Sequence, residues 1–168
     1  AEEAGEARGI SLVEICESPW FGVVPVFLEP DEVAHLVAAA AALPADCWRP
    51  AAEDPTRGSS SVAALRDVSA AYAEVVAERL AALLDAEPSC VEPPAVERLG
   101  PGQFVFERHP GLGRSHSAIV YLTSVDAACE DGVTDFKHTT FQFRPDLAGA
   151  ALVWRNIDPQ GRIDDRLK

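Results

Sequence analysis

The chain has 168 residues, of which 48% are hydrophobic and 24% are charged. This length fits one domain that can bury a hydrophobic core without disulfides, and no apolar run reaches the ~18 residues that a membrane span requires. Acidic residues outnumber basic ones by 27 to 14, so the net charge of -13 opposes binding to the phosphates of nucleic acids.

The chain begins with a short acidic segment, residues 1–9, for which we expect a disordered tail. Because this segment is acidic and leads into no long apolar stretch, we do not expect a signal peptide. Residues 10–168 are then expected to form a single domain. Two apolar stretches, 12–16 and 21–28, open that domain and have the length and composition of strands.

Helical periodicity begins at Pro30. Apolar side chains recur three and four residues apart, and Asp31 and Glu32 complement the positive N-terminal end of the helix. Pro44 ends this helix, and a loop rich in Pro, Gly and Ser follows to about residue 61. A second amphipathic helix is predicted after the loop. We therefore predict two helices within about residues 30–87.

From residue 95 the pattern changes to short strands separated by glycines. None of these runs has a helical period, and β-branched and aromatic residues are frequent in them. The runs are 95–99, 103–108, 117–122, 139–143 and 150–154. Helices in one half and strands in the other are typical of an α+β domain. We predict an antiparallel sandwich or barrel over about residues 95–168, supported by the two N-terminal helices.

The four cysteines, Cys16, Cys47, Cys90 and Cys129, lie far apart in the sequence, without a Cys-x-x-Cys pair or a histidine at zinc-finger spacing. We therefore expect no structural zinc ion. Free thiols are the simplest interpretation and suit a reducing compartment, which predicts a cytoplasmic location.

The four histidines differ in their sequence contexts. His35 lies beside the apolar stripe of the first predicted helix, where a structural role is expected. His138 follows Lys137 in a polar connection and is expected to be solvated. His116 opens a strand, either as a packing residue or as a hydrogen-bond donor behind a site. His109 ends the strand that follows a Gly-Pro-Gly turn, at the rim where a barrel holds its ligands.

Four stretches of the second half, read together, resemble the Fe(II)/2-oxoglutarate dioxygenases of the prolyl 4-hydroxylase type. Residues 99–109 are similar to the family's strand that leads to the first iron ligand, and residues 114–126 to its Arg-x-x-Thr-x-x-x-Tyr-Leu strand. Residues 131–136 are similar to its Gly-Gly-Glu-Thr-x-Phe hairpin, and residues 149–166 to its Gly-x-Ala-Leu-x-Phe-Trp strand and turn. All four occur in the family's order, which makes the combination more specific than any one motif.

The resemblance extends into the first half of the chain. Residues 27–36 are similar to the family's strand-to-helix entry, and Arg57 with Ser59 and Ser60 resembles its Arg-x-Ser stretch. The resemblance therefore covers most of the sequence. It implies a double-stranded β-helix, a jelly-roll fold, that holds Fe(II) with two histidines and one carboxylate and binds 2-oxoglutarate beside the metal. It also allows for ascorbate as a further cofactor.

Individual residues take roles from this resemblance. His109 corresponds to the first iron ligand, and Tyr121 to a hydrogen-bond donor to a carboxylate of 2-oxoglutarate, although a core tyrosine that caps a strand is an equal interpretation. Arg57 and Thr134 fall where contacts with the substrate are expected. Trp154 corresponds to a core aromatic residue with a packing role. Residues 99–168 contain 9 acids and 8 bases, so their net charge is close to zero. This half of the chain can therefore bind an anionic cosubstrate without strong electrostatic repulsion.

Three departures from the family pattern bear on the chemistry. Gly111 stands two residues after His109, where the family has its carboxylate ligand. Related iron halogenases have a small residue at this position and bind chloride in its place. The interval from His109 to Arg114 is shorter than the family pattern, and the sequence ends where the distal histidine is due. Val133 replaces the glutamate of the hairpin.

The leading hypothesis is an oxygenase that uses Fe(II) and 2-oxoglutarate to hydroxylate a peptidyl or free amino acid or a related small metabolite. The second is an iron- and 2-oxoglutarate-dependent halogenase in which chloride occupies the space at Gly111. The third is a non-catalytic β-helix module that binds a ligand without iron, because only His109 of the three ligands is visible. The expected partner is a small-molecule or peptide substrate, and neither a nucleic acid nor a membrane.

Overall fold

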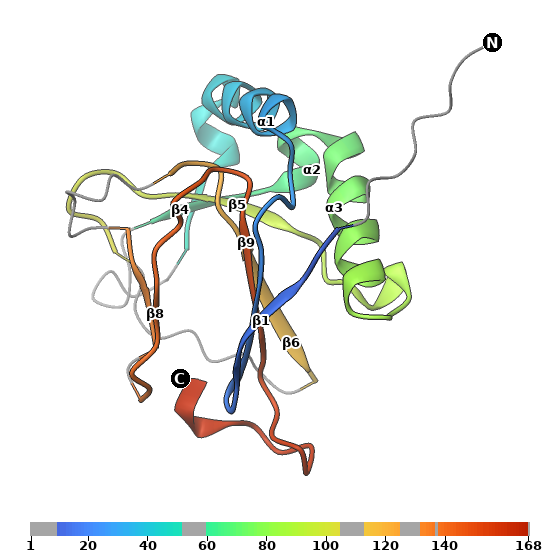
Figure 1. Cartoon of the computed structure of the whole chain (residues 1–168). Coiled ribbons are helices and arrows are strands. Elements are labelled where there is room, and N and C mark those ends of the chain that lie inside the picture. Colours follow the sequence, from blue (N-terminus) through green and yellow to red (C-terminus); the bar gives the residue numbers. More distant parts are fainter. Residues whose placement is uncertain (1–9, 52–59, 105–112, 125–131, 137, 168) are drawn as a thin grey trace.

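The structure, a computed structural model, describes residues 10–51, 60–104, 113–124, 132–136 and 138–167 (Figure 1). Within these residues the α-helices are α1 (Pro30–Ala42), α2 (Leu65–Val68) and α3 (Ala70–Leu83). The strands are β1 (Val13–Glu17), β2 (Trp20–Val24), β3 (Arg49–Pro50), β4 (Ser61–Ala64), β5 (Ala95–Arg98), β6 (His116–Val120), β7 (Thr134–Asp135), β8 (Gln142–Phe143) and β9 (Ala151–Arg155). Helices occur together with antiparallel sheets, which confirms the predicted α+β class.

The main sheet joins segments from both ends of the sequence. Its strand order is β1-β2-β9-β6, and every neighbouring pair is antiparallel. β9 lies inside this sheet because it is an apolar strand, and its residues Ala151, Leu152 and Val153 have no exposed surface (0%). The register of β2 on β9 aligns Val24 with Ala151. The late strand β9 is thus held between the early strand β2 and β6.

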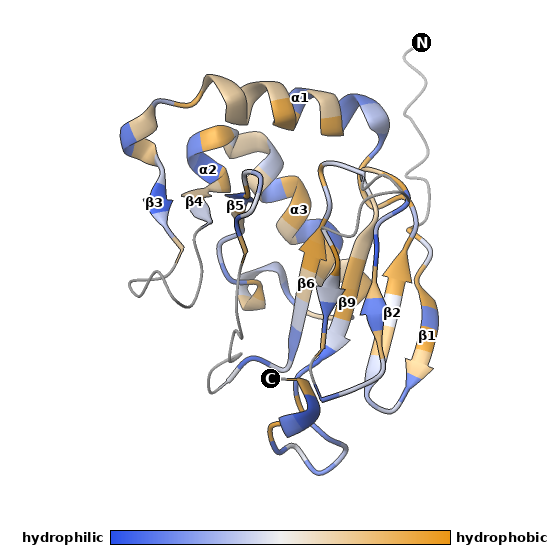
Figure 2. Ribbon diagram, turned by 90° about the vertical axis from the view of Figure 1, so that its left-hand side faces the viewer, coloured by the Kyte–Doolittle hydropathy of each residue, from blue (hydrophilic) through white to orange (hydrophobic). Residues whose placement is uncertain are grey.

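Helices cover one face of the main sheet. Val24 and Ala151 on this face form one buried cluster with Val33 and Leu36 of α1 and Val76 of α3. Figure 2 shows α1, α2 and α3 grouped at one end and side of the sheet, with apolar residues along its strands. In Figure 1, α3 lies on one side of the sheet and β8 on the other. The predicted helical support is therefore present.

The opposite face of the main sheet packs against the hairpin β7–β8. The ring of Phe21 on β2 lies 4.7 Å from that of Phe136 and 4.3 Å from that of Phe141, measured between centroids. β6 and β9 are neighbours in the main sheet, whereas β7 and β8, which lie between them in sequence, form a separate sheet. The chain from β6 to β9 therefore folds back on itself, so that the hairpin β7–β8 packs on the sheet that contains β6 and β9.

A third sheet, β3-β4-β5, adjoins the helices. Val96 of β5 and Leu65 of α2 belong to the same buried cluster as α1 and α3, and the backbone N–H of Leu65 donates to Pro94 O at 2.9 Å. The sequence predicts only a loop from Pro44 to about residue 61 and gives no signal for β3, because a two-residue strand carries no periodicity of its own. Pairing with β4, rather than local propensity, creates this strand.

The predicted second helix is in fact two helices, α2 and α3, separated at Ser69. Ser69 has an extended backbone, and its side-chain oxygen accepts a hydrogen bond from the N–H of Tyr72 at 3.5 Å, so that Ser69 is the N-cap of α3. The expected pair of N-terminal helices is thereby corrected to three in the described part of the chain. One polar residue inside a continuous apolar period does not reveal such a break from sequence.

Two further expectations concern the chain termini and membranes. Residues 1–9, for which a tail was predicted, lie outside the described residues. Among the helices that the structure describes, none is both long and apolar enough to cross a membrane.

Arg79 of α3 forms hydrogen bonds with α1 and with the segment between β2 and α1. Its guanidinium donates to the carboxylate of Glu32 on α1 at 2.7 and 2.8 Å and to the carbonyl of Phe27 at 3.0 Å. The hydrogen bond from Arg79 holds the pKa of Glu32 below its ordinary value. We expect Arg79→Ala to lower the free energy of unfolding by about 1–3 kcal/mol, measured by denaturant titration. A change below about 0.5 kcal/mol would mean that solvent screening cancels the interaction.

Candidate functional site

Two hydroxyl side chains with separate predicted roles are in contact in the structure. Tyr121 directly follows β6, and Thr134 is the first residue of β7. The phenol oxygen of Tyr121 lies 2.6 Å from the side-chain oxygen of Thr134, although 13 positions separate the two residues in sequence. The fold therefore brings together the residue predicted to bind 2-oxoglutarate and one of those predicted to contact the substrate.

The backbone holds Tyr121 on both sides. Its N–H donates to the carbonyl of Ala150 at 2.9 Å, and its carbonyl accepts from the N–H of Gly149 at 2.7 Å. Gly149 in turn accepts from the N–H groups of Phe27 and Leu28, at 2.9 and 3.0 Å. The pairing of β6 with β9 is thus continued past the end of β6, and the position of Tyr121 is coupled to the entry of α1.

The Tyr121 phenol is neutral at physiological pH. Burial raises the pKa of Tyr121 to about 12, and the hydrogen bond with Thr134 opposes this shift. In a bonded pair of hydroxyls, one O–H is donated to the other oxygen and the second O–H remains able to donate elsewhere. The pair can therefore donate a hydrogen bond to an anionic group, such as a carboxylate, without itself carrying charge.

The surroundings of this hydroxyl pair are apolar. The ring of Tyr121 lies 5.5 Å from that of Phe143 on β8, and the ring of Trp154 lies 5.3 Å from that of Phe136. Trp154 therefore packs among aromatic residues, as predicted. Ile119, two residues before Tyr121 on the same face of β6, keeps 36% of its surface exposed. A weakly polar environment strengthens hydrogen bonds formed at the hydroxyl pair.

Other predicted site residues fall outside the described part of the chain. These are His109, Gly111 and Arg57. Ser60, at the end of the Arg-x-Ser stretch, is described: it is buried and donates to the carboxylate of Glu97 at 2.5 Å. Among the described residues, no three His, Cys, Asp or Glu side chains are grouped so as to hold a metal ion. The described residues therefore include no such metal-ligating group.

The remaining histidines do not converge on the hydroxyl pair. His35 is exposed on α1, with its ring 5.2 Å from that of Tyr72, and His138 is exposed, as expected. His116 packs edge-on against Trp20 at 6.0 Å, and its Nδ1 lies 3.0 Å from the hydroxyl oxygen of Ser115. Of the two interpretations of His116, the structure favours packing.

His116 makes the stability of the main sheet dependent on pH. Burial lowers the pKa of His116 below its ordinary 6.5, and the positive charge of Arg155, its partner on β9, lowers it further. Because the unfolded chain binds the proton more readily, the stability associated with neutral His116 is complete above about pH 6.5 and is lost as the pH falls through the folded-state pKa. We expect His116→Gln to reduce this acid-side loss, measured by denaturant unfolding between about pH 7.5 and about pH 5. Identical pH profiles would contradict the assignment to His116.

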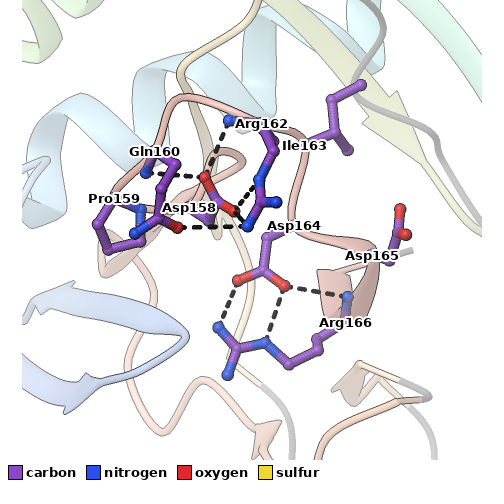
Figure 3. A pocket seen from close by; sticks show the side chains of 8 residues that line it. All are labelled: Asp158, Pro159, Gln160, Arg162, Ile163, Asp164, Asp165 and Arg166. Atoms are coloured by element: carbon purple, nitrogen blue, oxygen red, sulfur yellow. Dashed lines mark hydrogen bonds and ion pairs between the residues drawn. The ribbon is translucent and has the colours of Figure 1, made fainter.

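A polar hollow lies beyond the end of β9 (Figure 3). It is lined by residues between Asp158 and Arg166. The backbone N–H of Arg162 lowers the pKa of Asp158, and the side chain of Arg166 lowers that of Asp164. Figure 3 shows these carboxylates turned toward their arginine partners. Local hydrogen bonds therefore pair the negative charges of Asp158 and Asp164 with arginines. The hollow lies in a turn that these bonds stabilise.

No sequence signal distinguishes Asn156, a buried polar residue at the start of this turn. Its exposed fraction is 1%, and its side chain donates to Ser117 of β6. An Asn directly after an apolar strand is common in turns, so only the hydrogen bonds of the folded chain distinguish this residue.

No protein-family model matches the chain, and a search of curated proteins finds no significant match. The resemblance to the dioxygenases therefore rests on the motifs quoted above.

Proposed function

We propose that this protein is an Fe(II)- and 2-oxoglutarate-dependent oxygenase that hydroxylates a peptidyl or free amino acid or a related small metabolite. The observation that carries the proposal is the 2.6 Å contact between the hydroxyls of Tyr121 and Thr134. The motifs assign these residues to the cosubstrate and the substrate without reference to any structure. Their contact supports the existence of one site that both residues line.

We propose further that the sheets belong to a double-stranded β-helix. A jelly roll consists of two antiparallel sheets that pack face to face. In this chain β6 and β9 are neighbours in one sheet, and the hairpin β7–β8 packs on that sheet through an aromatic cluster that includes Phe21 and Phe136. This arrangement of consecutive strands supports a rolled sheet over a single flat one.

Each residue has a separate task in this proposal. The neutral Tyr121–Thr134 pair donates a hydrogen bond to a carboxylate of 2-oxoglutarate, and the ring of Phe143 beside it limits the access of water. His109 is the residue that would supply an imidazole to Fe(II). When bound, the metal supplies oxygen activation, which needs open coordination positions beside the protein ligands.

The test is an anaerobic titration of the full chain with Fe(II) and then with 2-oxoglutarate, followed by visible absorption. We expect a metal-to-ligand charge-transfer band that grows with 2-oxoglutarate and saturates. Zn(II) in place of Fe(II) is the control and should give no band, because Zn(II) has a filled d shell. If folded protein gives no band, the oxygenase proposal is rejected. The non-catalytic binding module is then the hypothesis that stands.

Once the band is observed, dioxygen and a panel of free amino acids and peptides are added to the sample to separate hydroxylation from halogenation. A product found by mass spectrometry to contain oxygen, in equal yield with and without chloride, supports a hydroxylase. A product that forms only with chloride would reassign the protein to the halogenases, as Gly111 allows.

A further inference from the structure

Asn156 connects three segments of the chain around the start of β6. Its side-chain N–H groups donate to the carbonyl of Arg114 at 3.2 Å and to the hydroxyl of Ser117 at 2.8 Å. Its backbone N–H donates to Ser115 O, and its backbone carbonyl accepts from the N–H of Asp164, both at 2.8 Å. Because Asn156 is 1% exposed, the loss of any of these bonds leaves a buried polar group without a partner.

β6 depends on these bonds because it is an edge strand in the described part of the chain. It pairs with β9 on one side, and the strand order places it last in the main sheet. Backbone bonds to Ala150 and Gly149 hold its far end at Tyr121. The amide of Asn156 holds its near end. The strand that leads to Tyr121 is thus held by hydrogen bonds at both ends.

Ser117 and Tyr121 lie on the same face of this strand. Alternate residues of a strand point to the same side, and Ser117, Ile119 and Tyr121 alternate. In the register, Ser117 is opposite Trp154, which packs in the aromatic cluster that also contains Tyr121. Through Ser117, Asn156 therefore contacts the face of β6 that leads to Tyr121.

The oxygen and the nitrogen of the Asn156 side-chain amide differ in their hydrogen bonding. Its Oδ1 is buried and has no hydrogen-bond donor among the described residues, whereas both hydrogens of its Nδ2 are donated. The anchoring of β6 therefore depends on the donors of the amide. An aspartate at this position has a similar shape but no N–H to donate to the carbonyl of Arg114, although the hydroxyl of Ser117 can turn and donate to its carboxylate. Asn156→Asp therefore tests the bond to Arg114.

We propose that Asn156 is a positioning residue for keto-acid binding, whose amide donors fix the start of β6 so that Tyr121 meets Thr134 at the candidate site. The inference rests on the proposed function. The variants that test it are Asn156→Ala and Asn156→Asp. The matched control is Ser69→Ala, which weakens the helical layer by removing the N-cap of α3, whose side-chain oxygen accepts from the N–H of Tyr72.

The measurements are the affinity for 2-oxoglutarate, by calorimetry under argon with Fe(II) present, and the hydrogen exchange of the β6 amides in metal-free protein. We expect both Asn156 variants to bind 2-oxoglutarate about tenfold more weakly than the wild type and to exchange the β6 amides faster. Ser69→Ala should bind within about twofold of the wild type despite its lower stability.

Each outcome decides between two explanations. Equal affinity losses in Asn156→Ala and Ser69→Ala, or wild-type affinity in Asn156→Asp, would overturn the positioning role and leave the proposed function standing. No 2-oxoglutarate binding by the wild type would remove both. If Asn156→Ala does not fold, Ser117→Ala removes one of the two side-chain bonds and should weaken binding about threefold, whereas unchanged affinity would reject the role.

Discussion

Replacement of Gly149 by alanine should lower the free energy of unfolding by about 3–5 kcal/mol and the melting temperature by roughly 10 °C. Gly149 has a φ of +91°, which L side chains rarely adopt, and a Cβ atom there would overlap the carbonyl oxygen of Leu28. Leu28 itself donates to the carbonyl of Gly149 at 3.0 Å, so neither backbone can move without losing that bond. Thermal and denaturant unfolding measure the effect.

Gly102→Ala is the control for backbone strain alone. Gly102 has a φ of +73°, but nothing lies within 4 Å of the position that its Cβ would occupy. We expect a loss of about 1 kcal/mol for this variant, because the unfavourable conformation is present without the overlap. Equal losses in the two variants would show that the contact with Leu28 is not the cause.

Tyr121→Phe should weaken the binding of 2-oxoglutarate by about 10- to 100-fold, because a hydrogen bond to a charged group contributes about 1.5–3 kcal/mol. The phenylalanine ring keeps the packing on Phe143, so the variant loses the phenol oxygen and its bond to Thr134 and little else. The anaerobic titration with Fe(II) measures the affinity. Stability should fall by only about 1 kcal/mol.

Tyr72→Phe provides a matched control, because it also removes one phenol oxygen. The chain has 2 tyrosines, and Tyr72 lies on α3, where it packs against the buried cluster that contains Leu36 and Val76. It should leave the affinity for 2-oxoglutarate unchanged. Thr134→Val, which keeps the side-chain shape and removes the hydroxyl, should weaken binding less than Tyr121→Phe. If Tyr121→Phe binds as tightly as the wild type, the phenol does not contact the keto acid, and Tyr121 is a core residue that caps β6.

Elements defined by local signals were predicted well. α1 begins at Pro30 with a capping box formed by Glu29 and Glu32, and it ends before Pro44, where the prolines and charges of the sequence indicated. Short apolar runs located β5, β6 and β9 to within a few residues. Strands β3 and β7, of two residues each, were beyond this approach because their pairing partners create them.

The candidate site was only partly accessible from sequence. Motifs selected Tyr121 and Thr134 as separate residues, and their hydrogen bond follows from the packing of the hairpin β7–β8 on the main sheet. Asn156 carried no sequence signal, because its role consists of bonds to Arg114, Ser117 and Asp164. His109, the predicted iron ligand, lies outside the described residues and stays a prediction.

The amino-acid sequence alone determined the α+β class, the start of the first helix and the position of most strands. These features depend on periodicity, capping and turn residues, which act within a few positions along the chain. Only the tertiary structure decided that β9 inserts between β2 and β6, that Ser69 divides a helix, and that Tyr121 meets Thr134. Such contacts join distant segments, and burial of a shared apolar surface selects them, which no local pattern encodes.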